Sequence, residues 1–304
     1  MDSAGVTQNL RIQDLDCRVD AHREAGAHLR LITFRPQGDQ ALTARAWLPG
    51  QFVMIDPPTP TFLLRRPMSV MRVHDDGRFD VFYKVHGKGT ALMARLAPGD
   101  AVRVLGPLGR HFTIETPSSG QPESAPRTLL VGGGIGIAPL AMLADALAQA
   151  GHPTPLCCYG VRGAAEIGVL EELQARFGPD RLLIATDDGS YGFSGNVCDL
   201  LQAHATRLDG ITRAAICGPT PMMRAVSAWL SAFNPAIAQE VSLEIMMPCG
   251  TGACGGCVTF RRDGALPVKT CLEGPVFDPK DILWPGETAS CTVETRAATC
   301  GDLL

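Results

Sequence analysis

Four cysteines near the carboxyl-terminal end have a spacing that suits metal chemistry. Cys249, Cys254 and Cys257 lie within nine residues, interleaved with glycine, and Cys271 follows after thirteen further residues. Glycine contributes no side-chain contacts and relaxes the backbone, so core packing does not explain this stretch. C-x4-C-x2-C followed by a distant cysteine is typical of plant-type [2Fe–2S] clusters. The sequence therefore predicts an iron–sulfur cluster in a loop that wraps closely around it.

A zinc ion or a set of disulfide bonds accounts for these thiols less well than a cluster does. A structural zinc site is usually built on paired C-x2-C knuckles, which the four-residue spacing fits poorly. A disulfide framework is disfavoured because the chain has eleven cysteines, an odd number, and its first eleven residues lack the apolar run of a secretory signal. We therefore expect a reducing, cytoplasmic location.

Composition narrows the class of protein further. A chain of 304 residues with 45% hydrophobic content is long enough for two or three compact units. No stretch approaches the roughly eighteen uninterrupted apolar residues of a membrane span. The net charge of -4 and the pI near 6.0 give no basic footprint for nucleic acid. We expect neither a membrane span nor a nucleic-acid partner.

The elements that precede the cysteines fall into two groups, of which the first is rich in strands. Short apolar or alternating runs separated by proline and glycine turns occur at 29–34, 50–55, 67–72, 79–85 and 101–105. This spacing predicts a small antiparallel β-barrel within residues 8–119, with one short helix at 90–96.

Two stretches of this predicted barrel suit a phosphate-bearing cofactor. In the first, Arg66 and Ser69 follow an apolar segment, and the guanidinium fork matches phosphate oxygens while a hydroxyl can bond a ring nitrogen. A solvated arginine pair at a strand edge explains the same residues equally well. In the second, residues 84–90, a strand runs through two glycines into a helix, whose first N–H groups can hold an anion. A simple turn is the alternative there.

Beyond a linker rich in proline and polar residues at 120–127, strands and helices alternate. Strands are expected at 128–131, 156–159, 182–185 and 214–217, and helices at 140–150, 169–177, 197–204 and 222–232. Such alternation favours a parallel sheet with helices on both faces, within residues 126–240.

Three loops at the ends of these strands are candidates for binding a nicotinamide nucleotide. They are the glycine-rich loop 132–139, the stretch 186–190 that contains Asp187, and the stretch 217–223. Open α/β sheets bind ligands at such strand ends, and a pyrophosphate meets helix N–H groups there. Arg162, after the second strand, either faces a 2′-phosphate and indicates NADPH or is a surface charge.

The barrel motifs R-P-x-S and G-x-G-T resemble elements of the ferredoxin–NADP reductase superfamily, which implies FAD. The resemblance implies that Arg66 lies against the flavin pyrophosphate, Ser69 faces the isoalloxazine edge, and Gly89 with Thr90 holds phosphate. The loops G-G-G-x-G-x-A-P and C-G-P-x-P-M are similar to the superfamily's nicotinamide site, in which Cys217 would lie near the nicotinamide.

The whole chain resembles the iron–sulfur electron-transfer subunits of dihydroorotate dehydrogenase B. The most specific stretches are residues 241–249 and the pattern C-x-x-G-P-V-F at 271–277. The resemblance implies NADH as electron donor, with NADPH the alternative, and an FMN-containing dihydroorotate dehydrogenase catalytic subunit as partner in a heterotetramer. Related subunits of electron-bifurcating NADPH–ferredoxin reductases have Asp in place of the first cysteine, so Cys249 favours the dihydroorotate family.

Taken together, the motifs and the resemblance give one set of candidate residues. The cofactor-binding candidates are Arg66, Pro67, Met68, Ser69, Tyr83, Lys84, Val85, Gly89, Thr90, Gly132, Gly133, Gly134, Gly136, Asp187, Cys217, Gly218 and Pro219, and the metal ligands implied are Cys249, Cys254, Cys257 and Cys271. No Ser-His-Asp or paired-carboxylate constellation is recognisable, so no catalytic residue is predicted.

Several alternatives remain open at this point. Glu244 either lies near the flavin or nicotinamide or is an ordinary surface residue. Cys291 and Cys300, in the last segment at 241–304, are either further ligands or bystanders. Two other functions also fit: a stand-alone reductase that feeds a ferredoxin or an oxygenase, and a non-enzymatic iron–sulfur sensor.

Overall fold

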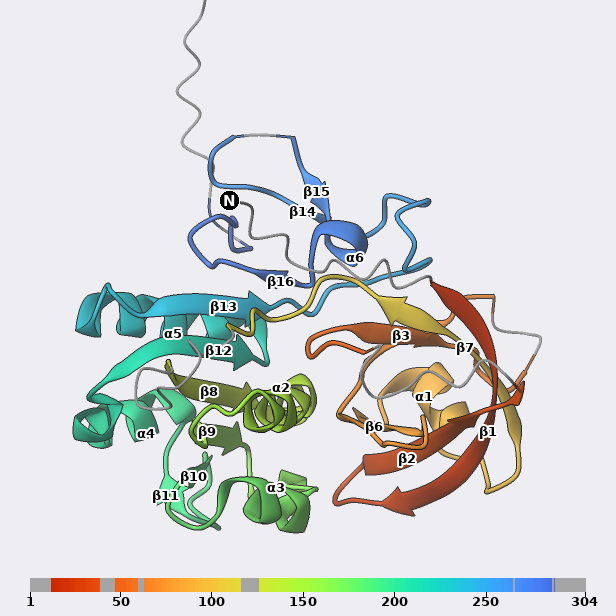
Figure 1. Cartoon of the computed structure of the whole chain (residues 1–304), viewed down its shortest axis with the longest axis horizontal. Helices are drawn as coiled ribbons and strands as arrows, with labels where there is room; N and C mark the ends of the chain where they lie inside the picture. Colours follow the sequence, from red (N-terminus) through yellow and green to blue (C-terminus); the bar gives the residue numbers. More distant parts are fainter. Residues whose placement is uncertain are drawn as a thin grey trace, which may run out of the picture.

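Two seven-stranded sheets and a small two-stranded sheet form the framework of the molecule. The computed structural model describes residues 12–38, 47–59, 63–115, 126–264, 266–285 and 287. Figure 1 shows the curled first sheet beside the open second sheet, with the carboxyl-terminal segment lying across both. Among the described residues, none of the helices is both long enough and apolar enough to cross a bilayer.

The predicted antiparallel barrel is confirmed as a curled sheet. Its strands are β1 (Gln13–Glu24), β2 (Leu29–Pro36), β3 (Phe52–Ile55), β4 (Arg66–Ser69), β5 (Arg72–Val73), β6 (Phe79–Lys84) and β7 (Ala101–Leu108). Their order is β4-β3-β7-β1-β2-β6-β5, and every neighbouring pair is antiparallel. Inward-facing side chains such as Leu15, Ile32 and Val81 form its apolar core.

Strand β1 is a part of the barrel that the expected strands omit. Leu15, Cys17 and Val19 are buried, whereas Asp16 and Arg18 between them are exposed. This alternation with period two is a strand signal. The charged residues hide it because they lower the apolar content of the stretch, and the pairing of β1 with both β2 and β7 then decides its structure.

The short helix of the barrel begins earlier than expected. Helix α1 covers Gly87–Met93 rather than 90–96. The hydroxyl of Thr90 accepts a hydrogen bond from the His86 backbone N–H at 2.7 Å and donates one to the His86 carbonyl at 2.7 Å. These bonds close the first turn around the two glycines, so the helix starts before Thr90 rather than at it.

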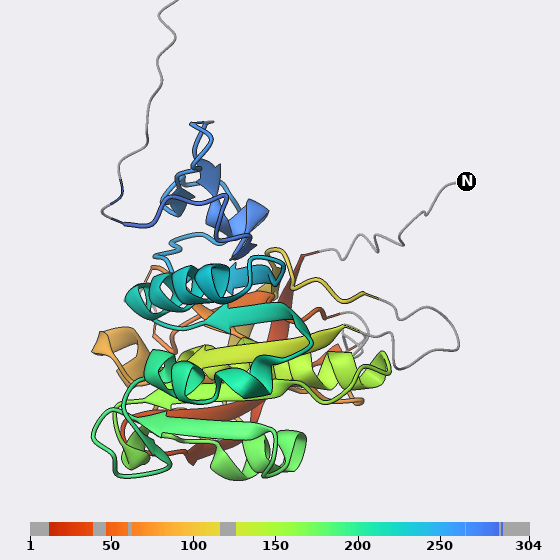
Figure 2. The ribbon, with the colours of Figure 1, turned by 90° about the vertical axis from the view of Figure 1, so that its left-hand side faces the viewer.

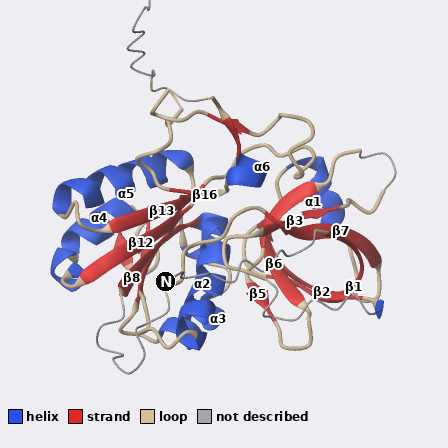
Figure 3. Cartoon of the chain, turned by 45° about the horizontal axis from the view of Figure 1, so that its top comes forward, coloured by secondary structure: helices blue, strands red, loops and turns tan. Residues whose placement is uncertain are grey.

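The α/β part has the predicted alternation. Its elements are β8 (Arg127–Gly133), α2 (Ile137–Gln149), β9 (Leu156–Val161), α3 (Leu170–Phe177), β10 (Leu182–Thr186), β11 (Phe193–Ser194), α4 (Val197–Ala203), β12 (Ile211–Cys217), α5 (Thr220–Phe233) and β13 (Ala238–Ser242). Helices α2 and α3 pack on one face of the sheet and α4 and α5 on the other (Figure 3).

The carboxyl-terminal segment is built into both larger units. It contains β14 (Val258–Thr259), β15 (Val268–Lys269), α6 (Thr270–Glu273) and β16 (Val276–Phe277). Strand β16 pairs antiparallel with β13 and so adds an edge strand to the parallel sheet. Figure 2 shows the rest of the segment projecting beyond the two sheets. Strand β13 runs past residue 240, the predicted end of the α/β part. The parallel sheet therefore includes the first two residues of the carboxyl-terminal segment.

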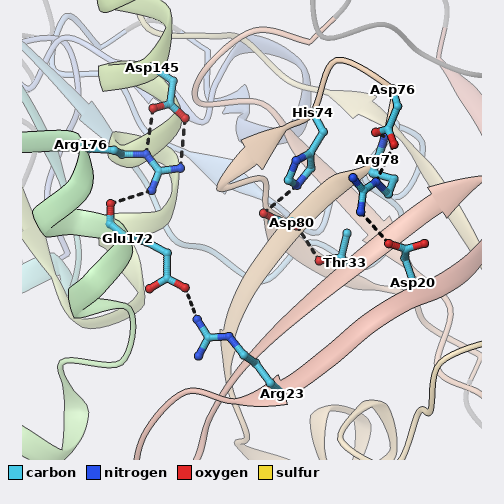
Figure 4. Close-up of polar contacts among 10 residues, drawn as sticks. All are labelled: Asp20, Arg23, Thr33, His74, Asp76, Arg78, Asp80, Asp145, Glu172 and Arg176. Carbon is cyan, nitrogen blue, oxygen red and sulfur yellow. Dashed lines mark hydrogen bonds and ion pairs between the residues drawn. The ribbon is translucent and has the colours of Figure 1, made fainter.

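Polar contacts fix the barrel against the α/β part. Arg23 of β1 forms an ion pair with Glu172 of α3, and the carbonyl of Glu172 in turn accepts from Arg176 (Figure 4). The backbone N–H of Ala27 donates to the Ala165 carbonyl at 2.8 Å. The loop that follows β9 therefore contacts the turn between β1 and β2. This contact joins the barrel to the α/β part.

Candidate functional site

Two adjoining cavities lie where the barrel meets the carboxyl edge of the parallel sheet. The first, of about 780 Å³, is lined from the barrel by the predicted residues Pro67, Met68, Tyr83, Lys84 and Thr90, and from the sheet by Gly133, Gly134, Asp187 and Pro219. The second, of about 550 Å³, adds Ser69, Gly136, Cys217 and Gly218. Both cavities share Pro67, Met68, Ile135 and Glu244, so they form one continuous space.

Four of the predicted cofactor residues do not line either cavity. Arg66 lies against Gly89, where an added Cβ would come within 2.2 Å of the arginine Nε. Val85 packs on the barrel core, and Gly132 leaves room for Ile137 of α2, whose Cδ1 would lie 2.9 Å from an added Cβ. Gly89 and Gly132 thus provide space for neighbouring groups.

Arg66 and the first turn of α1 nevertheless lie side by side, as the predicted phosphate site requires. The guanidinium of Arg66 donates to the Leu64 carbonyl at 2.7 Å, which holds it beside the amino end of the helix. The hydroxyl of Thr90 is bonded to His86 in both directions, so it shapes this turn. The phosphate-holding role of Gly89 and Thr90 stays a prediction.

Close backbone packing joins the two nucleotide loops of the sheet. A Cβ added to Gly136 would lie 2.4 Å from the Cys217 carbonyl oxygen and 2.7 Å from the Gly218 nitrogen. A Cβ on Gly133 would lie 2.4 Å from Met222 Sδ. Gly134 differs, because it has φ +54 and open space in front of it. Gly133 and Gly136 bring the loops together, and Gly134 leaves the cavity open.

The floor of the second cavity combines a buried thiol with an exposed carboxylate. Burial raises the pKa of Cys217 to about 12, although a hydrogen bond with the Ser242 hydroxyl lowers it, so the thiol is neutral. Glu244 lies on the junction of both cavities. The sequence left its role open, and the structure places it at the predicted meeting point of flavin and nicotinamide.

One ion pair across the first cavity is not apparent from the sequence. Lys84 of β6 and Glu166, in the turn after β9, are 2.9 Å apart, and both line the cavity. Lys84 is a predicted cofactor residue, whereas Glu166 is not. Their separation of 82 residues explains why no local pattern reveals the pair.

The four predicted cluster ligands lie in one loop region but form two pairs. The sulfur atoms of Cys257 and Cys271 are 3.2 Å apart, and Cys254 is one of the groups that lower the pKa of Cys249. The first pair is buried; Cys254 is exposed and Cys249 half-buried. The backbone N–H of Gly252 donates to Cys271 Sγ at 3.1 Å, and that of Gly256 to Cys254 Sγ at 3.4 Å.

The backbone of the loop also stabilises negative sulfur. Although burial opposes it, the N–H groups of Cys254 and Thr251 lower the pKa of Cys249 to about 6. Gly250, Gly252 and Gly255 have φ values of 74, 78 and 67, which L side chains rarely adopt. The glycines of the motif therefore let the loop turn its N–H groups toward sulfur.

This donor set fits a two-iron cluster better than one zinc ion. A structural zinc ion needs four ligands around one centre, whereas a [2Fe–2S] cluster is a larger body with two metal atoms. Two separate thiol pairs match the latter. Cys291 and Cys300 lie outside the described residues.

An apolar layer connects the second cavity to the buried thiol pair. Phe52 and Met247 line the cavity and also pack in one cluster with Cys257 and Cys271, together with Met54 and Leu108. The buried pair is thus the one nearer the cavity, and Cys254 lies on the outer side. The arrangement can bring a flavin and a metal cluster within one layer of side chains.

Comparisons with known proteins agree with this geometry. Residues 16–113 match an oxidoreductase FAD-binding domain, residues 130–228 an oxidoreductase NAD-binding domain, and residues 244–283 the iron–sulfur cluster binding domain of dihydroorotate dehydrogenase B.

Curated relatives cover most of the chain. The dihydroorotate dehydrogenase B (NAD(+)) electron transfer subunit of Bacillus caldolyticus is 39% identical over 243 residues, which are 77% of this chain and 86% of the relative. That of Desulforamulus reducens is 36% identical over 265 residues, 83% of this chain and 93% of the relative.

Solved structures add the fold. An NADH-dependent reduced ferredoxin–NADP oxidoreductase is similar with a TM-score of 0.74 and 28% identity, covering 88% of this chain and 90% of the other. A ferredoxin reductase of carbazole 1,9a-dioxygenase, with a TM-score of 0.59 and 22% identity over 73% of this chain and 66% of that one, shares the fold. The chain belongs to the family of dihydroorotate dehydrogenase B electron transfer subunits.

Proposed function

We propose that this chain carries electrons between NAD(H) and an FMN-containing dihydroorotate dehydrogenase catalytic subunit, by way of FAD and a [2Fe–2S] cluster. In pyrimidine biosynthesis the dehydrogenation of dihydroorotate releases two electrons and NAD⁺ takes them up, whereas NADH as donor drives the same path in reverse. The observation that carries this proposal is the continuity of three sites: a nucleotide cavity, a flavin cavity and a four-thiol loop joined by Phe52 and Met247. The names of the curated relatives support the donor and the type of partner.

Each group of residues has a defined task in this proposal. Arg66 and the first turn of α1 hold the flavin phosphates, and Ser69 lies at the cavity wall where the flavin ring is proposed to face the nicotinamide. Gly134 and the start of α2 receive the nucleotide pyrophosphate. When bound, FAD accepts a hydride and gives up single electrons, for which an iron–sulfur cluster is a carrier.

The neutral state of Cys217 matters for the same site. A thiol with a pKa near 12 places no negative charge beside the nicotinamide. The thiol lies beside Ile135, Gly136 and Leu243 in the wall of the cavity. The chain thus provides the surfaces that orient the two ring systems, and it needs no acid or base for this step.

The partner is proposed to dock over the exposed side of the cluster loop. Cys254 is exposed there, and so are Met246 and Leu272. A heterotetramer of two such chains and two catalytic subunits, in the cytoplasm, is part of this proposal. The competing function, a reductase that feeds a ferredoxin or an oxygenase, would use the same exposed surface for a different acceptor.

Reconstitution with the candidate partner tests the proposal. Purified chain and catalytic subunit are mixed under anaerobic conditions, and dihydroorotate-dependent reduction of NAD⁺ is followed. We expect turnover only when both proteins are present, because this chain carries the NAD site and the partner the dihydroorotate site. Oxidation of dihydroorotate by this chain alone, or rapid reduction of a small ferredoxin without any gain from the catalytic subunit, would refute it.

A further inference from the structure

We propose that Asp187 makes the nucleotide site select NADH over NADPH, and that Arg162 beside it is a latent receptor for a 2′-phosphate. The inference rests on the proposed function, since it concerns the donor nucleotide of the same site. It names the side chain that decides between the two donors, and it predicts that a single substitution strengthens binding of the 2′-phosphorylated nucleotide.

The order of the strands shows where each half of the nucleotide lies. Strands β12, β8, β9 and β10 are successive neighbours in the sheet, and the loops after them open at one edge. The nicotinamide faces the barrel near Cys217, at the end of β12, and the pyrophosphate lies over Gly134, after β8. The adenosine half therefore extends over β9 and β10, the latter roughly 10 Å from β8.

Arg162 and Asp187 are the first residues after β9 and β10. The two strands are in register there, with Val161 opposite Thr186. The Asp187 N–H donates to the Val161 carbonyl at 3.1 Å, and the N–H of Asp188 donates to the Arg162 carbonyl at 3.1 Å. Both side chains are exposed and line the first cavity, so the backbone holds two opposite charges at the expected position of the adenosine ribose.

Neighbouring carboxylates are less available than that of Asp187, because Asp188 does not line the cavity and Glu166 has a partner. The carboxylate of Asp188 accepts from the Ser190 N–H at 2.9 Å and from its hydroxyl at 2.5 Å. Glu166 is paired with Lys84. In the described part of the chain, the side chains of Asp187 and Arg162 form no ion pair or side-chain hydrogen bond. Asp187 is thus the carboxylate that is available to a ribose.

The chemistry of the two side chains explains the selection. A carboxylate accepts hydrogen bonds from the 2′- and 3′-hydroxyls of NADH but repels the 2′-phosphate of NADPH. A guanidinium matches phosphate oxygens with a planar pair of donors. While Asp187 is charged, it opposes any phosphate that Arg162 attracts. Without that charge, one of the carboxylates that oppose the attraction of Arg162 for a 2′-phosphate is removed.

Calorimetry with two probes that undergo no redox reaction tests this. ADP-ribose and 2′-phospho-ADP-ribose are titrated into the flavin-loaded full chain. We expect the native chain to bind ADP-ribose more tightly. The Asp187→Asn variant should bind 2′-phospho-ADP-ribose at least about tenfold more tightly than the native chain, the effect of removing a like charge within a few ångströms. The double variant Asp187→Asn/Arg162→Gln should lose that gain.

A matched control removes the same charge elsewhere. Asp209 is exposed and precedes β12, at the opposite edge of the sheet, so Asp209→Asn should change neither affinity. The inference is overturned if Asp187→Asn leaves the affinity for 2′-phospho-ADP-ribose unchanged, or if the gain persists without Arg162. Failure of the proposed function would appear differently, as native chain that binds ADP-ribose but whose flavin is not reduced by NADH.

Discussion

Cys254 is the exposed member of the four thiols, although it is proposed to hold the same cluster as the buried Cys257 and Cys271. This difference gives the cluster an inner and an outer side. The inner pair packs against Phe52 and Met247, which also line the flavin cavity, and the outer pair lies at the surface. Single residues thus already indicate the side of the cluster at which a partner protein can exchange electrons with this chain.

Replacement of one outer ligand tests the cluster independently of the flavin. We expect Cys254→Ser to lose most of its iron and its cluster absorption, because a neutral hydroxyl replaces a thiolate. Reduction of the flavin by NADH should persist, since that reaction takes place in the cavities. Iron analysis and anaerobic absorption spectra measure both. The control Cys17→Ala, within the barrel core, should keep its iron; full iron content in Cys254→Ser would argue against the ligand assignment.

The residue scale also shows what a sequence can and cannot predict. The cluster cysteines are recognisable because their spacing is local and unusual. The pair Lys84–Glu166 is not, because it depends on contact between two units. Thr90 lies in the predicted motif, yet its hydroxyl bonds to His86. A motif names the residues of a turn, but it does not tell whether side chain or backbone faces the ligand.

At the scale of elements, the loops after β8 and β12 lie so close together that Gly136 has no room for a side chain. We expect Gly136→Ala to weaken nucleotide binding at least about tenfold, because the new Cβ would meet the Cys217 carbonyl oxygen at 2.4 Å and force the loops apart. Titration with ADP-ribose measures this. Gly151→Ala is the control: it follows the same helix α2, has φ +81 and open space, and should cost about 1 kcal/mol of stability without changing affinity. Equal affinities in all three proteins would contradict the role of the close contact.

The start of α1 gives a prediction in which stability and binding change in opposite directions. In Gly89→Ala the helix gains a better helix former, worth up to about 1 kcal/mol. The added Cβ would overlap the Arg66 guanidinium, at 2.2 Å from Nε, and displace it from the proposed phosphate site. We expect a melting temperature that is unchanged or higher with weaker FAD retention, measured by flavin release on dilution.

The outcome of that test depends on its control. Gly99→Ala changes a glycine of the barrel that has φ +97 and open space, so it should lower stability and leave FAD retention unchanged. Undiminished FAD retention in Gly89→Ala would remove Arg66 from the proposed flavin site.

Elements also differ in how far the sequence predicts them. The alternating strands and helices of the α/β part follow from apolar periodicity, and their order is confirmed. Strand β16 is not predictable in this way, because its two residues, Val276 and Phe277, gain their structure from pairing with β13. Strand β1 is hidden by its charges for a related reason: its pairing partners come later in the chain.

At the scale of the whole molecule, the carboxyl-terminal segment is attached to both larger units. Its Gly274 carbonyl accepts from the Arg110 N–H at 2.6 Å, and β16 extends the parallel sheet. This leaves the connection between β14 and β15 exposed, with Phe260 and Leu266 exposed by 59% and 87%. An exposed apolar surface beside a proposed cluster is suited to a partner protein.

A charge on this connection tests the docking surface. We expect Leu266→Glu to weaken assembly with the catalytic subunit at least about tenfold, because an interface centre excludes unpaired charge. Reduction of the chain's own flavin by NADH should be unaffected. Phe233→Glu, at the end of α5 and 41% exposed, is the matched control. Analytical ultracentrifugation of the mixed subunits distinguishes them, and equal assembly of both variants would place the partner elsewhere.

The central claim is that two-electron reduction by NADH in the cavities supplies single electrons to the four-thiol loop. Anaerobic titration of the purified chain with NADH, followed by absorption and by electron paramagnetic resonance, tests it most directly. We predict that the flavin absorption bleaches and that the paramagnetic signal of a reduced [2Fe–2S] centre appears in the same titration, while dihydroorotate alone produces neither. Bleaching of the flavin without any iron–sulfur signal, or zinc in place of iron in the loop, would contradict the account.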